Sequence, residues 1–321
     1  MITAVTTHQF PIFKLFYEHK LHTELKENLI LYVDKEDSSE FKAIVDKSKT
    51  TIFDRSDIIK YYGKYYLPNA PYCKKMYFLN MISELRLLVH DDLYMTDDDI
   101  LIYNKSFYEI KNSDKIIHDK DTWPKIEDYK KKWPIVYKWY KDNMSGDPLF
   151  MMATNFFIPK MYTQKFSEIF AKKFSSFIKL LKSESDYIDE LNNKSKCNRN
   201  CDFSVFYLEV PFFDDVFTSL NKEAFLKIPI TCVGPGEISK IRDKLDTLDT
   251  DSIIQKFVKK SIYPKKQPLL HFNFANKEPL MSETFNYLNH KKLKYSNIND
   301  LLIEYPKERK KLEKVKSKNL F

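Results

Sequence analysis

Short β-branched runs alternate with helical patterns over the first hundred residues. The runs ITAVTT (2–7), NLILYVDK (28–35) and TTIFDR (50–55) are typical of strands, and FPIFKLFYEHKLHTEL (10–25) has helical periodicity. Strands separated by roughly 20–25 residues, with helices between them, are typical of βαβ units. The pattern therefore predicts an α/β fold with a mostly parallel central sheet flanked by helices.

A further helix and strand lead to three acidic residues. CKKMYFLNMISELRLLV (73–89) predicts a helix with one buried face. Its apolar positions recur at threefold spacing, at Met76, Leu79, Ile82 and Leu85. Lys74 and Lys75 open this helix; a solvated face is the simpler interpretation, and contact with a phosphate group of a ligand is the alternative.

The strand LYMT (93–96) runs directly into Asp97, Asp98 and Asp99. Three adjacent carboxylates repel one another, and aspartate is a poor strand residue. The segment is therefore either a solvated turn or a place where something positive binds. In open α/β sheets, ligands bind outside the carboxyl ends of the strands, which is where these residues fall.

The remainder of the chain is less regular. FMMATNFFIP (150–159) has the pattern of a strand, and YTQKFSEIFAKKFSSFIKLLKS (162–183) that of an amphipathic helix. The net charge is +8, and residues 307–318 (KERKKLEKVKSK) contribute seven Lys or Arg against two Glu. This basic, helical tail suits nucleic acid, phosphate-rich surfaces or acidic lipid, or it is a solvated helix end.

Several functional classes are excluded by composition. With only four glycines, the chain has no GxGxxG fingerprint and no GxxxxGK[ST] loop. No apolar run reaches the length of a transmembrane segment, and the first residues lack the pattern of a signal peptide. The four cysteines are most simply interpreted as reduced thiols, so we expect a cytoplasmic protein. Lys, Ile, Asn, Phe and Tyr are abundant, a bias typical of AT-rich genomes such as those of some phages, and a phage-encoded chain would be found in the host cytoplasm.

Two short motifs have the chemistry of a metal and phosphate site. Asp97 and Asp99 form an Asp-X-Asp motif, and carboxylate oxygens bind Mg²⁺ or Mn²⁺, which can neutralise a diphosphate. LLHFNFANKEP (269–279) contains His271 and Lys277. Imidazole suits Mn²⁺ as a third ligand, and a lysine ammonium can hold a phosphate oxygen.

Together these motifs resemble those of metal-dependent glycosyltransferases of the GT-A fold. The later one is similar to the His-x-x-Gly-x-x-Lys-Pro motif of the glycogenin and bacterial galactosyltransferase family. The resemblance implies a GT-A-like fold, Mn²⁺ (or Mg²⁺) and a nucleotide-sugar donor, with a UDP-sugar expected. The metal ligands that it implies are Asp97, Asp99 and His271. The donor-binding residues that it implies are Lys277 at the diphosphate, Thr6 or Thr7 near the base, and Asp98 either turned away or holding the sugar.

On this resemblance we expect three segments. Residues 1–104 would form the nucleotide-sugar-binding α/β half ending in the Asp-X-Asp motif. Residues 105–280 would form the acceptor-side half with the His/Lys element, and residues 281–321 a basic, helical C-terminal extension.

A third candidate lies in PFFDDVFTSL (211–220), where Asp214 and Asp215 open a predicted helix. In an inverting transfer, an acidic residue there could act as general base on the acceptor hydroxyl. The alternative is a helix N-cap, because carboxylates complement the free N–H groups and the dipole at that end.

We therefore expect a sugar-transferring enzyme, a hexosyl- or pentosyltransferase. The acceptor is left open. A hydroxymethylated base in phage DNA fits the basic tail and the AT-rich residue bias, and a bacterial surface glycan fits comparably. A metal-dependent nuclease or nucleotidyltransferase would also use the aspartates. A non-catalytic nucleic-acid-binding protein would use the tail but leave the aspartates unexplained. Nothing in the sequence indicates the oligomeric state.

Overall fold

The computed structural model describes residues 1–66, 74–102, 105–119 and 155–183, with shorter stretches at 212, 216–217, 219–220, 225–228, 230–233, 269–272, 281–282, 285 and 303–304. The α-helices are α1 (Phe10–Glu18), α2 (Ser39–Ile44), α3 (Arg55–Tyr62), α4 (Lys74–Glu84) and α7 (Lys160–Ser183). Short 3₁₀ helices are η1 (Lys20–His22), η2 (Glu24–Lys26), η3 (Gly63–Tyr65) and η5 (Lys105–Asn112). The strands are β1 (Ile2–Thr7), β2 (Leu29–Val33), β3 (Thr50–Asp54), β4 (Leu93–Asp97), β5 (Ile100–Ile102), β6 (Ile116–Asp119), β7 (Phe156–Ile158), β8 (Phe225–Ile228), β9 (Ile230–Val233), β10 (Leu269–Phe272) and β11 (Ile303–Glu304).

Eight of these strands form one mixed sheet in the order β11-β8-β6-β7-β4-β1-β2-β3. The run β4-β1-β2-β3 is parallel throughout, and β6 and β8 are also parallel. Antiparallel pairing enters where β7 lies between β4 and β6, and at β11. A separate three-stranded sheet has the order β5-β10-β9. The predicted α/β fold with a mostly parallel central sheet flanked by helices is confirmed.

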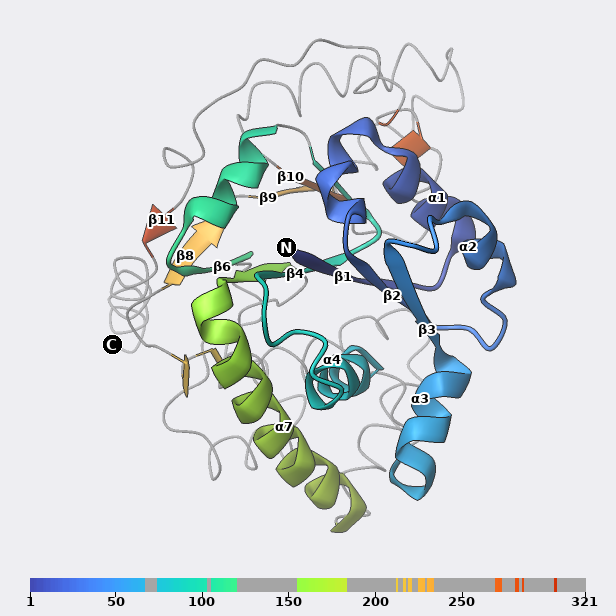
Figure 1. Cartoon of the computed structure of the whole chain (residues 1–321), viewed down its shortest axis with the longest axis vertical. Coiled ribbons are helices and arrows are strands. Elements are labelled where there is room, and N and C mark those ends of the chain that lie inside the picture. Colours follow the sequence, from blue (N-terminus) through green and yellow to red (C-terminus); the bar gives the residue numbers. More distant parts are fainter. Residues whose placement is uncertain are drawn as a thin grey trace, which may run out of the picture.

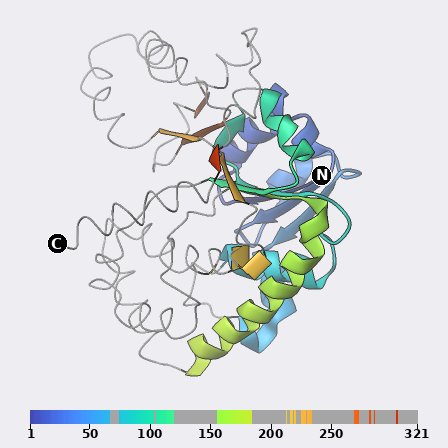
Figure 2. The same cartoon turned by 90° about the vertical axis from the view of Figure 1, so that its left-hand side faces the viewer.

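Helices cover both faces of the central sheet (Figure 1). Successive strand side chains point to opposite faces, so Ile30 and Tyr32 of β2 pack with α3, α4 and α7, whereas Leu29 and Leu31 pack with α1 and α2. The view turned by 90° shows the same division, with α3 and α7 on one side and α1 and η5 on the other (Figure 2). Both faces being apolar explains why β2 reads as an uninterrupted hydrophobic run.

The predicted strands at 2–7, 28–35, 50–55 and 93–96 correspond to β1, β2, β3 and β4, and the helix predicted at 162–183 to α7. The expectation of a single buried face on the helix at 73–89 was wrong. From Lys75 to Ser83 every residue of α4 is buried, because the helix lies against α7 and the sheet. Leu85 is 44% exposed, because α4 ends at Glu84.

The eight-stranded sheet takes strands from each of the three predicted segments. In the C-terminal segment, β11 pairs with β8, and residues 307–318 lie outside the described residues. The proposed segment boundaries stay predictions. Within the described ranges, no helix has both the length and the apolar character needed to cross a bilayer.

Two buried histidines attach the edge of β5 to the segment after α1. The backbone N–H of Ile102 donates to His22 Nε2 at 2.9 Å, so the His22 proton lies on Nδ1, which donates to Phe16 O at 2.8 Å. His19 Nε2 donates to the Ile102 carbonyl at 2.8 Å. Burial, aided by the neighbouring His19, holds the pKa of His22 well below its usual range. The folded protein therefore contains His22 in its neutral form, held by hydrogen bonds at both ring nitrogens.

We expect acid to destabilise the protein through His22. Below pH ~6.5 the unfolded chain binds a proton at this residue that the folded protein excludes, so stability falls as pH falls. Between pH 7.5 and 5.5 the loss from one such group is about 1.4 kcal/mol. Urea unfolding at both pH values measures this loss. Between pH 7.5 and 5.5, the free energy of unfolding should fall by about 1.4 kcal/mol more in the wild type than in His22→Gln. The exposed His90, changed to Gln, serves as control; equal pH dependence in wild type and His22→Gln would contradict the assignment.

Candidate functional site

Polar side chains gather where the parallel strands end. Thr6 and Thr7 end β1, Asp34 follows β2, and Asp97 ends β4. The registers place Thr6 opposite Asp97 and Thr7 opposite Val33. Because neighbouring parallel strands have their carboxyl ends at one edge of the sheet, these groups share the edge at which α/β proteins bind ligands.

The acidic triplet forms the connection from the central sheet to the small sheet. Asp97 is the last residue of β4, Asp98 and Asp99 form a turn, and β5 begins at Ile100. Asp98 and Asp99 are only 4% and 7% exposed. The alternative of a solvated turn is therefore wrong, and these carboxylates need partners within the protein.

Asp97 meets a positive charge. Its Oδ1 accepts hydrogen bonds from Thr6 Oγ1 at 2.5 Å and from Lys75 Nζ at 3.0 Å. Lys75 is itself 8% exposed, so the interpretation of this lysine as part of a solvated face was wrong. The ammonium at the start of α4 and the carboxylate at the end of β4 form a largely buried ion pair.

Asp98 has a different neighbour. Its Oδ2 accepts a hydrogen bond from Thr7 Oγ1 at 2.5 Å. The two threonines predicted to lie near the nucleotide base are thus paired one-to-one with Asp97 and Asp98. This pairing fixes the end of β1 to the acidic turn.

Asp99 and His271 lie together although they are far apart in the sequence. β10 pairs antiparallel with β5, which places His271 opposite Ile100. His271 Nε2 is 3.5 Å from Asp99 Oδ1, and the Phe272 N–H donates to Asp99 O at 3.0 Å. His271 is 4% exposed. The small sheet therefore delivers an imidazole to the end of β4.

The donor types at this site suit Mn²⁺ or Mg²⁺, because carboxylate oxygen and imidazole nitrogen are ligands of such ions. Asp99 and His271 already face each other, whereas Asp97 is engaged by Lys75 and Thr6. Among the residues that the structure describes, no three His, Cys, Asp or Glu side chains are gathered closely enough to hold an ion. The donor chemistry fits a metal, but the three side chains would have to move closer together to bind one, and Lys75 competes for Asp97.

The remaining predicted site residues are outside the described part of the chain. Asp214 and Asp215, the candidate general bases, and Lys277, the candidate diphosphate ligand, all fall there. Their roles stay predictions.

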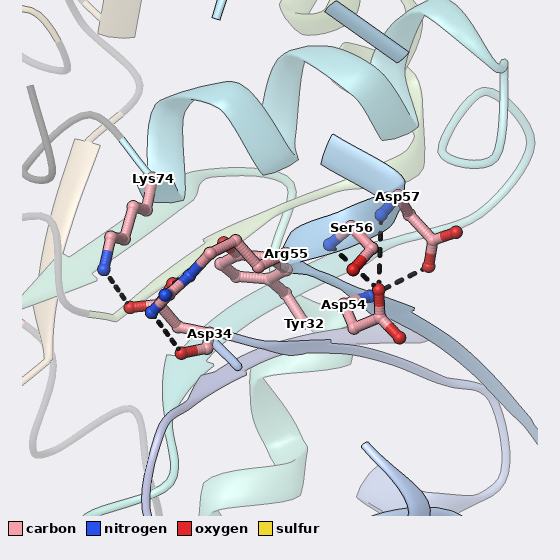
Figure 3. A network of polar contacts seen from close by, with 7 residues as sticks. All are labelled: Tyr32, Asp34, Asp54, Arg55, Ser56, Asp57 and Lys74. Atoms are coloured by element: carbon pink, nitrogen blue, oxygen red, sulfur yellow. Dashed lines mark hydrogen bonds and ion pairs between the residues drawn. The ribbon is translucent and has the colours of Figure 1, made fainter. Parts of the chain in front are cut away.

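Sequence reasoning missed the polar network at the end of β2 (Figure 3). Asp34 accepts from Arg55 Nε at 3.1 Å and from Tyr32 OH at 3.2 Å, and Lys74 is also paired with it. Burial and the nearby Asp34 raise the pKa of Tyr32, so its hydroxyl stays a donor. The available signal was a lone aspartate directly after a buried strand, which is too common to single out by itself.

A second missed residue supports the end of β4. Asn155, directly before β7, is fully buried, and its Oδ1 accepts from Thr96 Oγ1 at 2.5 Å and Tyr94 OH at 3.3 Å. Thr96 immediately precedes Asp97. The amide therefore fixes the position from which Asp97 extends.

No protein-family model and no curated protein sequence matches this chain. Solved structures that are similar include the galactosyltransferase LgtC in complex with donor and acceptor sugar analogs (TM-score 0.47, 11% identity, 94% of this chain and 99% of that one). Mouse xyloside xylosyltransferase 1 is similar at TM-score 0.42 and 11% identity, over 86% and 99% of the two chains. The glycosyltransferase GlyE of Streptococcus pneumoniae has TM-score 0.35 and 10% identity, over 91% and 60%. At these identities and TM-scores, the likenesses assign neither an activity nor a site residue to this chain.

Proposed function

We propose that this protein is a metal-dependent glycosyltransferase that moves a sugar from a nucleoside-diphosphate sugar to an acceptor hydroxyl. The observation that carries the proposal is the meeting of Asp99 with His271 beside Asp97, at the ligand-binding edge of an α/β sheet. The half-buried carboxylate of Asp97, the buried carboxylate of Asp99 and the imidazole of His271 would be the donor set of a Mn²⁺ or Mg²⁺ site.

In this proposal Asp97, Asp99 and His271 would hold the ion. When bound, a divalent cation neutralises the negative charge that develops on a leaving diphosphate. The chain's own contribution is to bring these donors to one edge of the central sheet. Thr6, Thr7 and Asn155 hold the end of β4 through hydrogen bonds to Asp97, Asp98 and Thr96.

The nucleoside would lie over the ends of β1 and β2. Asp34 is the acidic residue after the second strand, a position that suits hydrogen bonds from ribose hydroxyls. Thr6 and Thr7 stay candidates for the base side, and Asp98 for the sugar. Lys277 is proposed at the diphosphate, and Asp214 or Asp215 as general base if the transfer inverts.

The acceptor is proposed from the sequence alone. A hydroxymethylated base in phage DNA would use the basic tail, and a bacterial surface glycan is the other candidate. The transferred sugar is proposed to be a hexose or a pentose.

Calorimetric titration with UDP, with and without Mn²⁺, tests the function. We expect binding that is at least about tenfold tighter with the metal, within the usual range of coupling between two ligands. If UDP fails, GDP, CDP and dTDP follow under the same conditions. Failure of all four in the presence of Mn²⁺ would rule out the proposal.

A product assay separates sugar transfer from the phosphoryl-transfer alternative. Release of free nucleoside diphosphate from a nucleotide sugar indicates sugar transfer. Release of pyrophosphate from a nucleoside triphosphate indicates nucleotidyl transfer, and would replace the proposed function.

A further inference from the structure

Two consecutive lysines at the start of α4 contact carboxylates at the ends of two different strands. Lys74 pairs with Asp34 after β2, and Lys75 pairs with Asp97 at the end of β4. A cation in the first turn of a helix is disfavoured by the helix dipole. Both ammonium groups therefore depend on the carboxylates that they meet.

Burial makes this dependence stronger for Lys75. Its side chain is 9% exposed, against 26% for Lys74. A buried ammonium that loses its anion carries a large desolvation penalty. Loss of the Asp97 carboxylate is therefore costly for Lys75 unless another negative charge compensates the ammonium.

A metal ion at Asp97 would compete with this ammonium for the charge of the carboxylate. Lys75 Nζ lies 3.0 Å from Asp97 Oδ1, the same atom that accepts from Thr6. Two cations on one carboxylate oxygen would repel each other at short range. The ion pair thus opposes metal binding for as long as no second anion is present.

We propose that Lys75 is an internal counter-ion that occupies Asp97 in the nucleotide-free protein, and yields it only when a metal arrives together with an anionic ligand. The inference rests on the proposed function, since it takes Asp97 as a metal ligand. It makes metal and nucleotide binding mutually dependent: each ligand provides the charge that the other requires. The ion pair partly neutralises the acidic turn and weakens the binding of a divalent ion in the absence of nucleotide.

The test measures Mn²⁺ binding without any turnover. Free Mn²⁺ is followed by electron paramagnetic resonance, with and without UDP, for the wild type and for Lys75→Met, which keeps an apolar stem in the buried position. We expect the wild type to bind Mn²⁺ about 5- to 150-fold tighter with UDP, as is usual for coupled ligands. Lys75→Met should bind Mn²⁺ alone at least about tenfold tighter than the wild type and gain little from UDP.

Lys74→Met is the matched control. It removes the same charge from the adjacent residue of the same helix turn, but Lys74 contacts Asp34, which also retains Arg55 as a partner. Its affinity for Mn²⁺ alone should stay within about twofold of the wild type, because only a general charge effect is removed. If Lys74→Met and Lys75→Met raised the affinity for Mn²⁺ alone by the same factor, overall charge and not competition at Asp97 would set that affinity.

The outcomes separate this inference from the function on which it rests. If the wild type shows UDP-coupled Mn²⁺ binding that Asp97→Asn loses, and Lys75→Met binds Mn²⁺ alone no better than the wild type, the counter-ion role is wrong and the function stands. If the wild type binds no Mn²⁺ even with UDP, the metal-dependent function itself fails, and the inference with it. Should Lys75→Met not fold, Lys75→Gln makes the same test with a neutral side chain that can still donate to Asp97.

Discussion

Asp99→Asn should lower the rate of nucleoside diphosphate release from a nucleotide sugar by about 100- to 1,000-fold, as losing one well-placed electrostatic group does in other enzymes. Asparagine has nearly the shape of aspartate but not its charge. It would weaken the proposed metal site at the point where His271 lies 3.5 Å away. The measurement is steady-state release of UDP from a UDP-sugar at saturating Mn²⁺, or of the nucleotide identified by the binding experiment.

Asp91→Asn is the control for this variant, since it makes the same chemical change before the other end of β4. Asp91 lies outside the acidic turn; its Oδ1 is 3.0 Å from the Met1 amine and accepts a hydrogen bond from the Asp92 N–H at 2.8 Å. Its rate should stay close to that of the wild type, and thermal unfolding of both variants checks that the fold is intact. A folded Asp99→Asn protein with a rate within about threefold of the wild type would remove Asp99 from the proposed site, since effects that small fall below the loss expected for such a group.

Phe78→Ala should destabilise the protein by about 3–5 kcal/mol, the range seen when a buried phenylalanine is truncated. The Phe78 ring is fully buried in α4 and stacks on Tyr32 of β2, with centroids 5.3 Å apart and an interplanar angle of 19°. The residue therefore joins the helix that carries Lys74 and Lys75 to the strand that leads to Asp34. Total stabilities of domains are about 5–15 kcal/mol, so the variant would lose a large share.

Urea unfolding followed by circular dichroism measures this loss. Phe78→Leu, which leaves a smaller cavity, should lose clearly less. Met161→Ala, at a side chain that is 67% exposed, should change stability by no more than about 0.5 kcal/mol. If Phe78→Ala lowered the free energy of unfolding by less than about 1 kcal/mol, α4 would not be packed as described. In a close-packed core, a cavity the size of a phenylalanine ring costs more than that.

The central strands and their edge could be predicted because they follow from local pattern. β2 is buried on both faces, which requires apolar residues at every position, and LILYV meets that requirement. The acidic triplet could be placed at the ligand-binding edge for the same reason, since it directly follows a buried strand. His271 was singled out only through the resemblance of LLHFNFANKEP to a glycosyltransferase motif, because a histidine followed six residues later by a lysine is common in a lysine-rich chain.

The partners of these residues could not be predicted, because they depend on tertiary contacts. Lys75 at a helix start has the sequence pattern of a surface lysine, and only the packing of α4 against the sheet brings it to Asp97. In the same way, His19 and His22 look like ordinary polar positions of the helix predicted over residues 10–25, although α1 ends at Glu18. Their role depends on the backbone of Ile102, about eighty residues later in the chain.

The pairing of β10 with β5 has a consequence for the order in which the protein is made. Asp97, Asp98 and Asp99 leave the ribosome with the first third of the chain, but His271 follows only after most of the polypeptide has been synthesised. Parallel pairings among β1 to β4 connect segments of that first third, so this part of the sheet can form early. The contact between Asp99 and His271 closes a much longer loop and belongs to a late step of folding. A nascent chain therefore acquires its carboxylates well before its imidazole, and the proposed site cannot be complete until synthesis is nearly finished.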